Sequence, residues 1–124
     1  MTGENTTRRR ILVVDDEADF AELVGAVRRH EGHDVDVALN GEAGLAALRR
    51  HASDLITLDI QMPGKSGLLL YRQLKSEAAF KDIPVLVVTG LTRSDRTAET
   101  FIHTFLAADH VPPPQAYLEK PPDN

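Results

Sequence analysis

Residues 11–17 read ILVVDDE, and this stretch decides how the rest of the chain is interpreted. It opens with a continuous apolar run rich in β-branched side chains, which is typical of a parallel strand buried on both faces. The run ends abruptly in Asp15, Asp16 and Glu17. Apolar residues then recur at the helical spacing i, i+3, i+4 and i+7, at Phe20, Leu23, Val24 and Val27. We therefore expect one strand, followed by a helix that packs through this apolar stripe and stops at Gly32.

The alternation of a strand and a helix repeats along the chain. Apolar runs predict further strands at 35–38, 55–58, 83–88 and 116–118. Helical spacing predicts helices at 41–50 with Asn40 as the cap, from Ser66 onward, and at about 94–108. Strands that alternate with helices form right-handed βαβ units, which give a parallel sheet covered by helices on both faces. The predicted fold class is therefore α/β, with a doubly wound sheet.

The carboxyl ends of the predicted strands carry the candidate site, because ligands of doubly wound sheets bind beyond these ends. The residues found there are Asp15, Asp16, Asp59, Thr89, Gly90 and Lys120. Carboxylates gathered at one edge of a sheet repel one another unless a cation neutralises them. Mg²⁺ prefers carboxylate, water and phosphate oxygens, so the sequence predicts Mg²⁺ as the cofactor of this site.

Four segments carry a resemblance to a known family. They are ILVVDDE at 11–17, DLITLDIQMPGKSG at 54–67, VVTG at 87–90 and YLEKP at 117–121. In this order they resemble the motifs of the response-regulator receiver domain of two-component signalling, and they cover nearly the whole chain. The resemblance implies a flavodoxin-like fold, in which a five-stranded parallel sheet has the order 2-1-3-4-5.

The resemblance also implies a role for each residue at the strand ends. Asp59 is implied as the phosphoacceptor, whose carboxylate attacks the phosphorus of a phosphohistidine or a small phosphodonor. The implied Mg²⁺ ligands are Asp15, Asp16, Asp59 and the backbone carbonyl of Gln61. The groups implied to hold the phosphoryl oxygens are Thr89, the Gly90 amide and Lys120. Phosphoryl transfer depends mainly on positioning and charge neutralisation, which gives Asp59, Thr89 and Lys120 the predicted catalytic roles.

The resemblance implies a conformational switch at Thr89 and Tyr117. In the family, the phosphoryl group draws the hydroxyl residue inward, and the aromatic residue three positions before the lysine turns in to fill the space. This change is a population shift between two packings. A tyrosine in a short edge strand is also commonly a half-buried packing residue, so that interpretation of Tyr117 stays open. A cis peptide bond is further implied at Lys120–Pro121.

Two features depart from the family pattern. The interval between Thr89 and Lys120 is longer than expected, and the surplus falls at 107–115, as a partner-docking element or a passive insertion. The sequence then reaches Asn124 without the final helix of the family, so either the chain is cut short or the fold ends early. We expect one flank of the sheet to lie bare, a surface that invites a partner or a homodimer.

The composition fits one globular domain, which we divide into a flexible tail at 1–10 and a receiver domain at 11–124. The chain has no cysteine, so disulfides and thiolate metal sites are excluded and a cytoplasmic setting is compatible. The apolar runs are too short to cross a membrane, and no membrane association is expected. The net charge is −5, so we predict that the acidic body repels nucleic acid and has no nucleic-acid partner.

The sequence therefore predicts a phosphorelay module and not an enzyme. It would accept a phosphoryl group on Asp59 from a histidine kinase or a phosphotransfer protein, and then switch the binding of a downstream partner protein. The alternative is a receiver-like interaction module that acts without phosphorylation. A flavodoxin-like cofactor binder or a small hydrolase is disfavoured, because carboxylates stand where such sites need a phosphate-binding loop.

Overall fold

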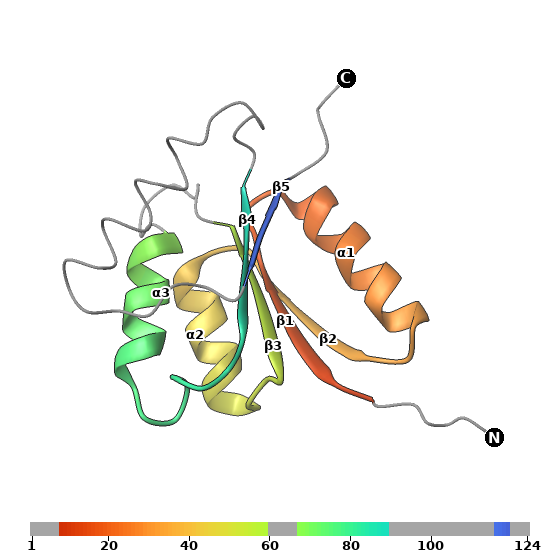
Figure 1. Cartoon of the computed structure of the whole chain (residues 1–124). Coiled ribbons are helices and arrows are strands. Elements are labelled where there is room, and N and C mark those ends of the chain that lie inside the picture. The colour runs from red at the N-terminus through yellow and green to blue at the C-terminus, as the bar shows by residue number, and fades with distance from the viewer. Residues whose placement is uncertain (1–7, 60–66, 90–115, 120–124) are drawn as a thin grey trace.

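The computed structural model describes residues 8–59, 67–89 and 116–119, which form a parallel sheet with helices on both of its faces (Figure 1). The elements in chain order are β1 (Arg10–Val14), α1 (Ala18–His30), β2 (Asp34–Ala38), α2 (Gly41–Arg50), β3 (Leu55–Asp59), α3 (Gly67–Ser76), β4 (Val85–Thr89) and β5 (Ala116–Glu119). The helix predicted at about 94–108, the surplus segment at 107–115 and the end of the chain after β5 lie outside the described residues.

The sheet has the order β2-β1-β3-β4-β5, and each neighbouring pair is parallel. This order confirms the predicted doubly wound α/β fold. The register brings the carboxyl ends of the strands together: Val14 pairs with Ala38 in β2 and with Leu58 in β3, and Asp59 pairs with Val88 in β4. The strands therefore end along one edge of the sheet, which is where the sequence has its polar residues.

Each strand differs from its predicted range by one or two residues at one end or both, and two of these differences have a local reason. The fourth strand begins at Val85 because Pro84 has no N–H to donate to the ladder. The Pro84 carbonyl still accepts a hydrogen bond from the Ile56 N–H, with an N···O distance of 3.0 Å. Strand β1 begins one residue earlier than expected, at Arg10, whose backbone N–H donates to Asp54 Oδ2 at 2.9 Å.

The core lies on both faces of the central strands, because alternate residues of a strand point to opposite faces. The face covered by α2 and α3 buries Leu12, Val14, Leu48, Ile56, Leu58, Leu70, Tyr71, Leu74, Phe80, Val85 and Val87. The face under α1 buries Ile11, Val13 and Ala21, with Val24, Val35, Val37 and Leu55 packed against them. The apolar run at 11–14 is therefore buried from both sides, as its sequence predicts.

Helix α1 packs on the sheet mainly through small side chains, with Val24 as the one member of its apolar stripe that packs against the buried cluster of this face. The buried residues of this helix are Ala21 and Gly25. The prediction that the stripe faces inward was wrong for two of its members, since Leu23 is 60% exposed and Val27 is 44% exposed. The other two members of the stripe are partly buried. Leu23 and Val27 thus lie on the flank of α1, beside its line of contact with the sheet.

Strand β2 forms one edge of the sheet, and two of its alternate residues are ion-paired aspartates. Arg8 donates to both carboxylate oxygens of Asp34, at 3.1 and 2.7 Å. Arg10 Nη1 lies 3.2 Å from Asp36 Oδ2. The Arg8 guanidinium, through its hydrogen bond, holds the pKa of the Asp34 carboxyl below its ordinary value. These ion pairs attach the start of β1 and the residues before it to the outer strand.

Helix α2 approaches β1 most closely at a glycine. Its N-terminus is capped as predicted, because Asn40 Oδ1 accepts a hydrogen bond from the Ala43 N–H at 2.8 Å. One turn later the helix passes directly over β1, so that a Cβ atom added at Gly44 would lie only 3.0 Å from Val14 Cγ2. A Cβ added at Gly25 of α1 would instead meet its neighbours at 3.5 Å, an ordinary contact.

Alanine substitutions at these two glycines should separate helix propensity from packing. Helix propensity alone should add about 0.5–1 kcal/mol to the free energy of unfolding for each replacement, because alanine loses less conformational entropy than glycine when a helix forms. We expect Gly25→Ala to raise the free energy of unfolding by about that amount, measured by urea denaturation. Gly44→Ala should leave the free energy of unfolding nearly unchanged or lower it, because the added methyl group makes a short contact with Val14. Equal gains for the two variants would contradict the close approach of α2 to β1.

Candidate functional site

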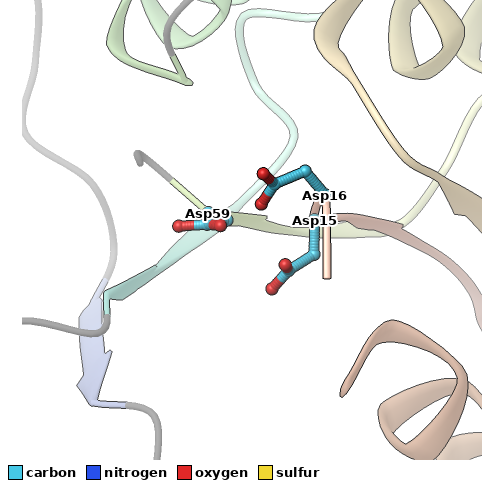
Figure 2. A group of neighbouring side chains, drawn as sticks. All are labelled: Asp15, Asp16 and Asp59. Carbon is cyan, nitrogen blue, oxygen red and sulfur yellow. The ribbon is translucent and has the colours of Figure 1, made fainter. Parts of the chain in front are cut away.

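Three aspartates meet at the carboxyl edge of the sheet, and two neighbouring strands bring them there (Figure 2). Asp15 and Asp16 directly follow β1, and Asp59 is the last residue of β3. Because β1 pairs with β3 in parallel, with Val14 opposite Leu58, the two strands end side by side. One carboxylate oxygen from each aspartate lies within 4.8 Å of those of the other two. We call these three residues the carboxylate cluster.

The members of the carboxylate cluster differ in burial. Asp15 and Asp59 are each only 2% exposed, whereas Asp16 is exposed to solvent. The position of Asp15 is fixed locally, since its Oδ1 accepts a hydrogen bond from the Glu17 N–H at 2.9 Å. Its own backbone N–H donates to the Ala38 carbonyl at 3.0 Å and so continues the pairing of β1 with β2. The cluster therefore presents one solvent-facing carboxylate beside two that the fold holds in place.

The hydrogen bond from the Glu17 N–H to Asp15 gives Asp15 a structural role in addition to its place in the carboxylate cluster. An aspartate that accepts from the backbone N–H two residues later forms an Asx turn, which here leads into α1. The sequence signal for this turn is an aspartate placed between a strand and a helix. Asp15 thus has a structural role and also lies in the carboxylate cluster, and the two roles use the same fixed geometry.

The electrostatics of the carboxylate cluster favour a hard cation. Two unit charges about 4 Å apart interact by roughly 1 kcal/mol in water, and by about 4 kcal/mol at the dielectric constant typical of protein surfaces. The donor set consists of carboxylate oxygens without imidazole or thiolate, which matches the preferences of Mg²⁺ and similar ions. Asp15, Asp16 and Asp59 are therefore suited to hold such an ion.

The other predicted site residues are placed only by the backbone or lie outside the described residues. Thr89 ends β4 one residue beyond Val88, the register partner of Asp59, so its backbone lies at the same edge of the sheet. Tyr117 lies in β5 and pairs with Val87 of β4. The predicted contributions of Gln61, Gly90 and Lys120, and the predicted cis bond at Lys120–Pro121, lie outside the described residues.

Comparison with known proteins agrees with the fold and the carboxylate cluster. The family model described as the response regulator receiver domain matches residues 11–112. The DNA-binding response regulator MtrA of Mycobacterium tuberculosis is 39% identical over 88 residues, covering 71% of this chain and 37% of MtrA. The response regulator PleD of Caulobacter vibrioides is 40% identical over 88 residues, covering 70% of this chain and 19% of PleD. The chain belongs to the response-regulator receiver family and spans about a third of the length of MtrA.

Solved structures of other response regulators share the fold of this chain. The response regulator TrrA of Thermotoga maritima, determined in complex with Mg²⁺ and BeF, has a TM-score of 0.70 and 30% identity, over 91% of this chain and 87% of that one. The chemotaxis protein CheY4 of Vibrio cholerae has a TM-score of 0.75 over 94% of this chain and 90% of its own, at 23% identity, which supports the fold alone. Receiver domains of this family are signalling modules of two-component systems.

The comparisons correct the prediction that nucleic acid plays no part. The MtrA relatives are DNA-binding response regulators, and the relative TcrX is a probable transcriptional regulatory protein. The net charge of −5 is summed over this chain, which covers 37% of MtrA. A charge summed over one part of such a protein says nothing about what another part binds, so the electrostatic exclusion was wrong.

No helix within residues 8–59, 67–89 and 116–119 is both long enough and apolar enough to cross a bilayer.

Neutralising one member of the carboxylate cluster should change stability in opposite directions with and without Mg²⁺. We expect Asp59→Asn to raise the free energy of unfolding by about 1 kcal/mol in EDTA, because it removes like-charge repulsion. Saturating Mg²⁺ should stabilise the unchanged protein by about 2.7 kcal/mol at a concentration 100 times the dissociation constant, and the variant by much less. Urea denaturation in both buffers measures these values.

Asp82→Asn is the matched control, because Asp82 is exposed and lies before β4, at the opposite end of the strand from the carboxylate cluster. It should keep the full stabilisation by Mg²⁺. An Asp59→Asn protein that gains as much from Mg²⁺ as the unchanged protein would rule out a cation at the carboxylate cluster.

Proposed function

We propose that this chain accepts a phosphoryl group on Asp59, in a Mg²⁺-dependent reaction of a two-component phosphorelay. The observation that carries the proposal is the carboxylate cluster, in which a buried aspartate at the end of β3 lies within 4.8 Å of two others in a receiver-family fold. The proposal takes residues 11–124 as the receiver and 1–10 as its tail. It also includes a cytoplasmic setting, with which a chain without cysteines is compatible.

The reaction we propose forms one bond and breaks one. An Asp59 carboxylate oxygen attacks the phosphorus of a phosphohistidine on a histidine kinase, or of a small phosphodonor, and the bond from phosphorus to the leaving group breaks. The product is an acyl phosphate on Asp59. Mg²⁺, when bound, offsets the negative charge that gathers between the carboxylates and the incoming phosphoryl group.

The residues of this chain are suited to hold the groups in position, which is most of what phosphoryl transfer requires. Asp15, Asp16, Asp59 and the carbonyl of Gln61 are our proposed ligands for Mg²⁺. The fixed position of Asp15 supports this assignment, because a ligand held by a backbone hydrogen bond loses little freedom on binding. The phosphoryl oxygens are assigned to Thr89, the Gly90 amide and Lys120.

The switch is proposed to lie in β4 and β5. These two strands are neighbours, and Val87 pairs with Tyr117 while Thr89 pairs with Glu119. A change at Thr89 therefore occurs in a strand that is hydrogen-bonded directly to the strand of Tyr117. We propose that a phosphoryl group on Asp59 biases these residues between two packings and so changes the surface offered to a partner.

Acetyl phosphate with Mg²⁺ tests the acceptor. We expect the intact mass of the unchanged protein to rise by one phosphoryl group, and Asp59→Asn to show no rise because it removes the nucleophilic oxygen. The Asp82→Asn control should react like the unchanged protein. If the unchanged protein gains no mass under conditions in which another receiver does, the chain is an interaction module that works without phosphorylation.

Tyrosine fluorescence tests the switch, because the chain has two tyrosines and no tryptophan. In a Tyr71→Phe background, Tyr117 is the single tyrosine emitter. We expect beryllofluoride with Mg²⁺ to change this emission, and Thr89→Val to abolish the change while Mg²⁺ still binds. An emission that beryllofluoride leaves unaltered would remove Tyr117 from the switch.

A further inference from the structure

Asp15 connects the carboxylate cluster to the start of α1 through two consecutive hydrogen bonds. Its Oδ1 accepts from the Glu17 N–H at 2.9 Å, and the Glu17 carbonyl accepts from the Ala21 N–H, also at 2.9 Å. Ala21 is fully buried and belongs to the part of the core that lies under α1. Two hydrogen bonds therefore separate a carboxylate of the cluster from the first buried residue of the helix.

The first turn of α1 has little buried surface of its own. Ala18 and Asp19 are exposed, and Phe20 is only partly buried. A turn with few buried contacts opens locally at a smaller cost in free energy than unfolding of the whole domain. The Asx turn at Asp15 fixes the backbone of Glu17, the N-cap residue of α1. This turn is therefore placed to control how often the start of the helix opens.

The carboxylate of Asp15 can take part in the Asx turn and in a cation site at once. An ionised carboxylate has about four lone-pair positions on its two oxygens, so accepting one N–H leaves room for a cation. Without a cation, the charges of Asp16 and Asp59 repel that of Asp15 and oppose the position that the turn requires. A cation at the cluster offsets this repulsion, and the position of Asp15 in the turn becomes more favourable.

Helix α2 provides an internal reference, because it follows β2 and so also begins at the carboxyl edge of the sheet. Its N-cap is Asn40, whose Oδ1 accepts from the Ala43 N–H at 2.8 Å. The Asn40 side chain carries no charge and is not a member of the carboxylate cluster. Opening of the first turn of α2 therefore leaves the cluster unchanged, whereas opening of the first turn of α1 releases Asp15.

We propose that Asp15 couples occupation of the carboxylate cluster by Mg²⁺ to the order of the first turn of α1. The position that Asp15 holds in the turn is also its position in the cluster. Opening of the turn therefore releases a ligand, and cation binding and turn formation favour each other by the same factor. The start of α1 then differs between the metal-free and the metal-bound protein before any phosphoryl group arrives. This inference rests on the cation site of the proposed function and does not depend on phosphoryl transfer.

Amide hydrogen exchange, followed by NMR spectroscopy with and without Mg²⁺ at matched ionic strength, tests the coupling. Titration calorimetry first gives the dissociation constant of Mg²⁺. At a concentration about ten times this constant, exchange of the Ala21 N–H should slow by roughly tenfold. Exchange of the Ala43 N–H in α2 should change by less than about twofold, because its opening releases no ligand.

Two substitutions at Glu17 separate the Asx turn from the carboxylates, because neither changes the cluster. Glu17→Pro removes the N–H that Asp15 accepts, and the φ of −86° at Glu17 is near the φ of about −65° that proline fixes. Glu17→Ala keeps this N–H and is the matched control, in which Mg²⁺ should slow exchange at Ala21 as in the unchanged protein. In Glu17→Pro the slowing should be lost and Mg²⁺ should bind more weakly, because the coupling is reciprocal.

The proposal is overturned if Mg²⁺ slows exchange at Ala21 of the unchanged protein no more than at Ala43, or if Glu17→Pro keeps either the slowing or the affinity of Glu17→Ala. If Glu17→Pro does not fold, the comparison of Ala21 with Ala43 in the unchanged protein decides. Absence of Mg²⁺ binding in calorimetry would remove the cation site together with this inference, whereas binding without slowing would remove the inference alone.

Discussion

The parallel pairing of β1 with β3 is the interaction on which the rest of the molecule depends. Val14 lies opposite Leu58, so the residues that follow β1 stand beside the last residue of β3. A shift of one residue in this register would turn the buried side chains of either strand toward the wrong face. The register of β1 against β3 therefore sets the distances within the carboxylate cluster.

Much of the fold could be predicted because its signals are local. Buried strands, helical spacing and turn residues gave the doubly wound α/β class, and the family resemblance gave the strand order. The ends of the strands gave Asp15, Asp16 and Asp59 as neighbours. The orientation of α1 could not be predicted in this way. An apolar stripe indicates that other residues cover it, but it does not show which side of the helix faces the sheet. The contact between α1 and the sheet is made mainly by Ala21 and Gly25, because small residues let the helix approach the sheet closely.

Two other predictions, the start of β4 and the exclusion of nucleic acid, were wrong for reasons of their own. The start of β4 depended on the missing N–H of Pro84, which strand propensity does not register. The exclusion of nucleic acid failed because net charge describes only the residues over which it is summed. The carboxylate cluster, in contrast, was predictable because identical charges placed together by a fold require a physical explanation, and a cation supplies it.

The ion pairs on β2 have a consequence for how copies of the protein behave toward one another. An outer strand offers unpaired N–H and C=O groups, to which a strand of another molecule can add. Here Asp34 and Asp36 are engaged by Arg8 and Arg10 along that strand. A second strand could align there only by stripping water from charged groups, so this edge resists the growth of aggregates at high concentration.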